Sequence, residues 1–155
     1  MTQSTSPRLA VIGCGYWGAN HVRTLGEMGV LHAVSDVHIE RAEMLAQPFG
    51  AKGVMPDEVF ADAAVDAVVL ALPAHVHAEF ALRAIADGKH VFVEKPLSLS
   101  SADGAHVVEQ AATAGKVLMT GHILCYHNAF VALRERIAAG DLGEIRYIQS
   151  HRLGF

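Results

Sequence analysis

The chain has 155 residues, of which 52% are hydrophobic and 18% are charged, so we expect a folded domain rather than a disordered chain. The formal net charge is −4 and no basic run occurs, which disfavours a nucleic-acid partner. No apolar run approaches the ~20 residues of a membrane span, no signal peptide is recognisable, and the two cysteines lack a spacing pattern, so we expect a reduced, cytoplasmic protein with no membrane partner.

Strands and helices are predicted to alternate after a polar tail over residues 1–7. Apolar runs predict strands at 8–13, 31–36, 53–55, 66–73, 90–96 and 116–121. Amphipathic spacing and Gly or Pro stops predict helices at 16–29, 38–50, from 56, at 75–87 and at 100–114. Asp57 is expected to cap the third of these helices, and Ser100 with Asp103 to form a capping box at the last. This alternation indicates an α/β fold, a doubly wound parallel sheet (Rossmann).

The turn after the first strand carries a glycine pattern, GxGxxG, made by Gly13, Gly15 and Gly18. The first glycine permits a tight turn, the second lets a diphosphate approach the backbone, and the third lets the helix pack close to the strand. The free amides and the dipole at the helix N-terminus favour a negative ligand. The pattern therefore predicts a dinucleotide site.

An acidic residue ends the second predicted strand. Asp36 lies 18 residues after Gly18, where a carboxylate accepts hydrogen bonds from the two hydroxyls of an adenosine ribose. It would repel a 2′-phosphate, so NAD is favoured over NADP, although the nearby Arg41 weakens that preference. The alternative is a solvated acid or a helix cap.

The stretch HVFVEKPLS places a lysine directly after a buried strand. Pro96 restricts Lys95 to an extended conformation, so the lysine projects from the carboxyl edge of the sheet, where ligands bind in such folds. The Lys95–Pro96 bond could be cis. The alternative for Lys95 is a plain surface lysine.

These residues together resemble the glucose-fructose oxidoreductase / inositol dehydrogenase family, often called Gfo/Idh/MocA. The matching stretches are GCGYWG at 13–18, Asp36, LPAHVH at 72–77, EKP at 94–96 and GH at 121–122. Order and spacing fit along residues 8–153. Within the family, YWGANHVR and GHILCYHNAF most resemble dehydrogenases of nucleotide-linked sugars or their uronates.

The resemblance implies a role for each matching residue. Lys95 would be catalytic, donating a hydrogen bond to the reacting hydroxyl and stabilising the alkoxide as hydride leaves for NAD. Tyr16 and Trp17 would flank the diphosphate, although helical spacing places Trp17, with Met28, in the core. The implied cofactor site comprises Gly13, Gly15, Tyr16, Trp17, Gly18, Asp36, Leu72, Pro73, His77, Glu94 and Lys95.

We expect a dinucleotide-binding domain over 8–122 and only the start of a second, α+β substrate domain over 123–155. A helix at 126–140 and a strand at 144–153 would begin that domain. The family's acid/base histidine comes later than residue 155, so this chain alone is expected to bind NAD weakly and to turn over poorly. The unpaired strand is expected to be disordered, to fold back or to pair with another copy in a homo-oligomer.

The predicted activity is hydride transfer between NAD and a secondary hydroxyl of a sugar or nucleotide sugar. Two alternatives stay open: a non-enzymatic NAD-binding module or sensor, and a methyltransferase, which EKP disfavours. The pairs His75/His77 and His122/His127 lack a further ligand at metal spacing, so no metal site is predicted.

Overall fold

The structure, a computed structural model, describes residues 6–151. Most of the predicted tail, residues 1–5, lies outside the described residues. The chain divides into two compact units, the first ending at Gly121 and the second beginning at His122. Each unit is described by itself below.

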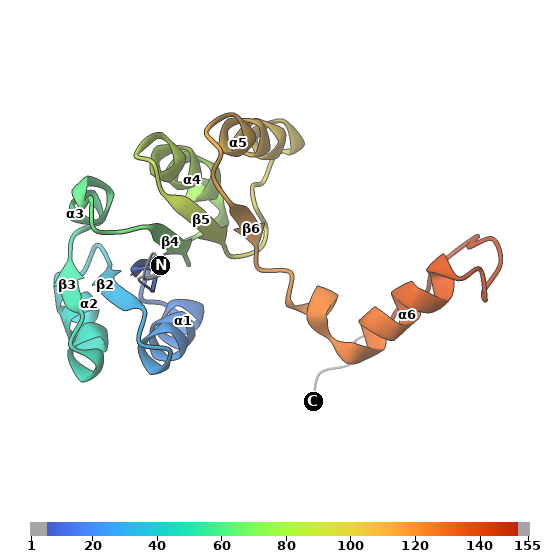
Figure 1. Ribbon diagram of the computed structural model, residues 1–155, viewed down its shortest axis with the longest axis horizontal. Coiled ribbons are helices and arrows are strands. Elements are labelled where there is room, and N and C mark those ends of the chain that lie inside the picture. The colour runs from blue at the N-terminus through green and yellow to red at the C-terminus, as the bar shows by residue number, and fades with distance from the viewer. Residues whose placement is uncertain (1–5, 152–155) are drawn as a thin grey trace, which may run out of the picture. The chain divides into compact units, whose positions relative to one another are not determined.

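The first unit is built on one parallel sheet (Figure 1). Its strands are β1 (Leu9–Ile12), β2 (Leu31–Ser35), β3 (Lys52–Val54), β4 (Ala67–Leu70), β5 (His90–Val93) and β6 (Leu118–Thr120). Among the described residues the strand order is β3-β2-β1-β4-β5-β6, and every neighbouring pair is parallel. This is the doubly wound order of a Rossmann fold, so the predicted fold class is confirmed.

Helices cover both faces of this sheet (Figure 1). They are α1 (Tyr16–Glu27), α2 (Ile39–Ala46), α3 (Pro56–Ala61), α4 (His77–Ala86) and α5 (Ser101–Thr113). Side chains alternate along a strand. Val11 therefore packs in the core under α1 and α2, whereas Ala10 and Ile12 pack in the core under α3, α4 and α5.

Two helix starts differ in how well the sequence predicted them. Ser100 Oγ accepts a hydrogen bond from the Asp103 backbone amide at the start of α5, which is the Ser100 half of the predicted capping box. The expectation for Asp57 was wrong, because α3 begins after Met55 and the Glu58 side chain accepts from the Met55 amide instead. The exposed Asp57 carboxylate pairs with Arg83 of α4 at 2.7 Å.

The second unit contains one longer helix, α6 (Asn128–Ala138), preceded by a short 3-10 turn at Ile123–Tyr126. The predicted strand at 144–153 is wrong over 144–151, which has no regular structure, and residues 152 and 153 lie outside the described residues. Extended backbone becomes a strand only when a neighbour bonds to it. The alternating apolar residues that predicted this strand do not provide a neighbouring strand for it to pair with. Within residues 6–151, no helix has the length and apolarity that crossing a membrane requires.

Candidate functional site

The turn between β1 and α1 contains three glycines in three different environments. Gly13 is buried with φ +103°, and a Cβ there would strike the Ala71 carbonyl oxygen. Gly18 is buried in α1, where a Cβ would strike the Gly13 carbonyl oxygen. Gly15 is exposed, and a Cβ would meet nothing within 4 Å. The fold therefore requires the outer two glycines, and the middle one leaves bare backbone open to a ligand.

Asp36 follows β2 and faces this turn. Its two carboxylate oxygens accept hydrogen bonds from the backbone amides of Cys14, at 2.7 Å, and His38, at 2.9 Å. Burial alone raises the pKa of this carboxyl, but the two amides and the nearby charge of Arg41 lower it by more, so the pKa lies below its usual value. Asp36 is therefore held as a carboxylate beside the glycine turn.

His77, at the start of α4, is almost fully buried, with 1% of its surface exposed. One ring nitrogen lies 2.6 Å from the Pro96 carbonyl oxygen and the other 2.7 Å from the Leu72 carbonyl oxygen. The ring thus joins the turn after β4 to the turn after β5. The resemblance implied that His77 lines the cofactor's path, but the ring lies below the surface, where its two nitrogens face backbone carbonyl oxygens.

Glu94 and Lys95 follow β5 at the carboxyl edge of the sheet. The Glu94 amide donates to the Leu70 carbonyl at 2.9 Å, and the Glu94 side chain is buried. Lys95 is exposed, and the Lys95–Pro96 peptide bond is cis. The strand end therefore buries one charged side chain and presents the next one to solvent.

A single cavity of about 680 Å³ collects most of the predicted site residues. Its lining includes Gly13, Gly15, Tyr16, Trp17, Asp36, Leu72, Pro73, Glu94 and Lys95. Gly18 and His77 are the predicted residues that lie beneath the surface instead. The first turn of α1 opens on the cavity and carries no acidic residue, so the helix dipole there favours an anion.

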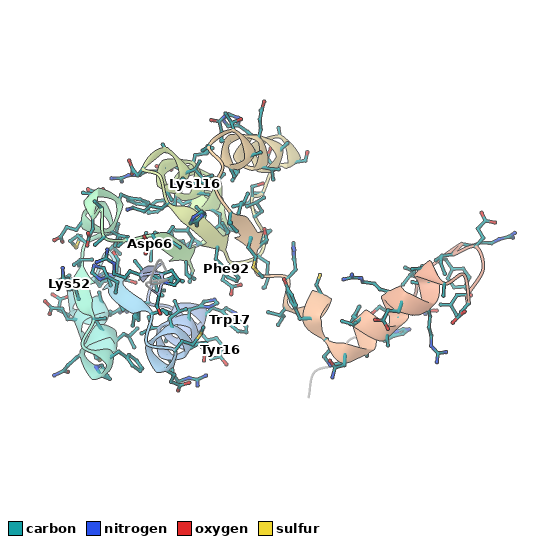
Figure 2. The ribbon with its side chains drawn as sticks, in the orientation of Figure 1. Tyr16, Trp17, Lys52, Asp66, Phe92 and Lys116 are labelled. Atoms are coloured by element: carbon teal, nitrogen blue, oxygen red, sulfur yellow. The ribbon has the colours of Figure 1, made fainter. Side chains whose placement is uncertain are left out.

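Tyr16 and Trp17 begin α1, where Figure 2 labels them. Both residues line the cavity. Their rings pack edge to face with centroids 5.4 Å apart. The prediction of Trp17 and Met28 as core residues was wrong, since 46% of Trp17 and 66% of Met28 are exposed. The buried face of α1 runs through Gly18 and Val22. Trp17 precedes Gly18 by one residue and therefore lies off this face.

Sequence reasoning overlooked His21 and gave no role to His38. His38 lines the cavity two residues after Asp36, and this closeness in sequence could have indicated it. His21 Nε2 lies 2.8 Å from Glu94 Oε1, a pairing between residues 73 positions apart. Nothing in the local pattern of α1 signals that pairing.

Comparison with known families gives a match at residues 7–122, three quarters of the chain, to the Gfo/Idh/MocA oxidoreductase family, NAD-binding Rossmann fold. The chain belongs to this family. Its first unit is thus a Gfo/Idh/MocA NAD-binding domain, and the open backbone at Gly15 beside an α1 N-terminus free of acidic residues fits the diphosphate of that cofactor.

Members of the Gfo/Idh/MocA family similar to this chain are longer. Inositol 2-dehydrogenase 1 of Saccharopolyspora erythraea is 35% identical over 88% of this chain and 43% of its own length. The structure of GenD2 from gentamicin A biosynthesis with NAD is 34% identical, with a TM-score of 0.78, covering 87% of this chain and 40% of that one. A mutant of the 3-ketoreductase KijD10 of Actinomadura kijaniata, with TDP-benzene and NADP, is 28% identical with a TM-score of 0.81, covering 92% and 46%. The chain therefore spans less than half of these relatives.

Cys14 lies in the glycine turn of this Gfo/Idh/MocA domain, and we expect its thiol to be poorly reactive. Burial, followed by the charge of Asp36, raises the pKa of the Cys14 thiol to about 11. Because the thiolate is the nucleophile, we expect alkylation near neutral pH roughly 300-fold slower than for a free thiol of pKa ~8.5. Peptide mapping after iodoacetamide treatment measures this, with the exposed Cys125 as internal reference. Labelling of Cys14 before Cys125 would contradict this expectation and indicate a reactive Cys14 thiol.

No group of three or more His, Cys, Asp or Glu side chains within residues 6–151 is arranged to hold a metal ion. His75 lines the cavity, whereas its sequence neighbour His77 is buried beneath it. The ring nitrogens of His75 and those of His77 face different environments, so these two residues cannot bind the same metal ion.

Proposed function

We propose that this chain is the cofactor-binding part of an NAD-dependent dehydrogenase that oxidises a secondary hydroxyl of a sugar or nucleotide sugar. The observation that carries the proposal is the cavity, which joins the bare backbone of Gly15, the carboxylate of Asp36 and the ammonium of Lys95. The division into a cofactor domain over 8–122 and the start of a substrate domain over 123–155 is part of this proposal.

The proposed cofactor orientation follows from the strand order, because β2, β1, β4 and β5 lie in that order and each is followed by one of these groups. The diphosphate lies on the amides of the glycine turn at the start of α1. Asp36 accepts from the ribose hydroxyls, since each carboxylate oxygen keeps an acceptor position beyond the one used by a backbone amide. Leu72 and Pro73 line the path toward Glu94 and Lys95.

Lys95 is the proposed catalytic residue. When bound, NAD would accept the hydride that leaves the carbon of the hydroxyl, and the hydroxyl proton would pass to a base of the whole protein. The exposed Lys95 side chain donates a hydrogen bond to the hydroxyl oxygen and stabilises the negative charge that develops there. A cation already in place before the reaction lowers the barrier more than one recruited from solvent, because it needs no reorganisation.

The substrate class rests on the relatives. An inositol dehydrogenase and a ketoreductase crystallised with a thymidine diphosphate compound are among them. Both act with a longer chain than this one, so the sugar or nucleotide-sugar substrate is proposed for the whole protein. A cytoplasmic location and a homo-oligomer stay predictions.

Calorimetric titration of the chain with NADH, NADPH and S-adenosylmethionine tests the proposal. We expect NADH to bind more tightly than NADPH, and S-adenosylmethionine not to bind. A chain that binds no NADH at millimolar concentration, or binds S-adenosylmethionine instead, would overturn it. In the whole protein, adding myo-inositol and a nucleotide sugar separates an enzyme from a sensor, because a sensor binds NADH identically with and without them.

Replacing Asp36 should weaken NADH binding without unfolding the chain. Asp36→Asn removes the charge that accepts from the ribose hydroxyls but keeps an oxygen acceptor for the Cys14 or His38 amide. Loss of charge-assisted hydrogen bonds predicts about 10–100-fold lower NADH affinity, with NADPH affected less. Glu109→Gln, which removes an exposed carboxylate from α5, is the charge-matched control. Equal losses in both variants would contradict the ribose role.

A further inference from the structure

Glu94 is a buried carboxylate, and the structure supplies one side-chain partner for it. Only 9% of Glu94 is exposed, although it lines the cavity floor. Its Oε1 lies 2.8 Å from Nε2 of His21. A carboxylate only accepts hydrogen bonds, so Nε2 carries the proton and donates. Without this donor the oxygen would be left buried and unsatisfied, which is costly.

The His21 ring is itself held in place. It stands on α1, which begins at the glycine turn, and its side chain is 24% exposed. The ring packs edge to face against Phe92, the β5 residue labelled in Figure 2, with centroids 5.3 Å apart and planes at 65°. Aromatic packing of this kind fixes the ring orientation, so that Nε2 is directed at Glu94.

The other oxygen of the carboxylate holds the backbone of the next residue. Glu94 Oε2 accepts from the Lys95 amide at 3.2 Å. On its far side lies Gly121, where a Cβ would come within 3.2 Å of the same oxygen. The carboxylate therefore has little freedom to turn once His21 fixes Oε1.

We propose that His21 is a positioning residue for Lys95, acting through Glu94. The catalytic role of Lys95 rests on the proposed function, but the mechanical link does not. By holding one oxygen of Glu94, His21 fixes the other oxygen where it accepts from the Lys95 amide, and so orients the turn that presents the lysine. The N-terminus of the same helix, α1, faces the proposed cofactor site, so one rigid element positions both the cofactor and the lysine.

Two variants and one control separate positioning from a structural role. His21→Leu keeps an apolar contact with Phe92 and removes the donor, whereas His21→Gln restores a donor toward Glu94. His106→Leu is the control, because His106 also lies near a glutamate, 3.9 Å from Glu109, but on an exposed part of α5. Backbone amide hydrogen exchange is followed by NMR in the full chain without cofactor.

We expect exchange of the Lys95 amide to be about tenfold faster in His21→Leu, with the core amide of Val11 unchanged, and near the original rate in His21→Gln and the control. NADH affinity should fall about tenfold in His21→Leu and recover in His21→Gln.

Three results would overturn the inference. These are an unchanged Lys95 rate in His21→Leu, a Lys95 rate that increases only together with that of Val11, and failure of His21→Gln to restore it. If the unaltered chain binds no NADH, the proposed function fails, while the exchange comparison still decides the role of His21 because it needs no cofactor.

Discussion

Gly18→Ala is expected to destabilise this chain severely. The added Cβ would coincide with the carbonyl oxygen of Gly13, which is backbone in a turn that is itself packed against Ala71. Neither side of the contact is a flexible side chain, so α1 would have to move away from β1. We expect a loss of about 3–5 kcal/mol, a large share of the ~5–15 kcal/mol that stabilises a typical domain.

Urea unfolding followed by circular dichroism measures this loss. Gly15→Ala is the matched control, because it adds the same methyl group three residues earlier, where nothing lies within 4 Å. The φ of Gly15 is −71°, which alanine adopts without strain, and Gly15 is the N-cap of α1, where alanine is a poorer cap, so the stability should change by no more than about 1 kcal/mol. An unaltered unfolding midpoint in Gly18→Ala would show that the packing of α1 on the turn is not as described.

Gly15→Ala is expected to weaken cofactor binding strongly while leaving the fold intact. The methyl group would project into the open space at the cavity, where the diphosphate is proposed to lie on the backbone. It would hold the phosphate oxygens beyond hydrogen-bonding distance of the amides at the start of α1. Loss of these charge-assisted hydrogen bonds predicts about 30–100-fold lower NADH affinity.

The NADH titration of Gly15→Ala needs a control that adds a methyl group elsewhere. Gly104→Ala does so on α5, outside the cavity, where the Ser98 hydroxyl at 2.9 Å is the side-chain atom that must move. We expect this variant to bind NADH like the unaltered chain. If Gly15→Ala bound NADH as well as the unaltered chain does, the diphosphate would lie away from the turn, and the proposed orientation would be wrong.

The sequence predicted the sheet and its covering helices well, because these depend on local patterns. Strands buried on both faces are short apolar runs, and each is separated from the next by an amphipathic segment with a Gly or Pro stop. The glycine pattern predicted the turn at 13–18, since only glycine adopts φ +103° at Gly13 at little cost.

The errors have a common cause, which is that burial and pairing depend on distant partners. Spacing along α1 placed Trp17 in the core, but the axis of that helix against the sheet directs Gly18 and Val22 inward instead. Asp57 had the composition of a cap, yet Arg83 of α4 provides a partner for it. The apolar alternation at 144–153 predicted a strand, and over 144–151 no neighbouring strand pairs with it.

By itself, then, the amino-acid sequence determined the strand–turn–helix that opens the domain, the acid that follows β2 and the lysine that follows β5, since each is specified within a few residues. The tertiary structure alone decided which glycine faces solvent, that His77 is buried beneath the site, and that His21 reaches Glu94 across 73 positions. The reason is physical: periodicity and turn chemistry act over neighbouring residues, whereas a buried charge finds its partner only when packing brings separate elements together.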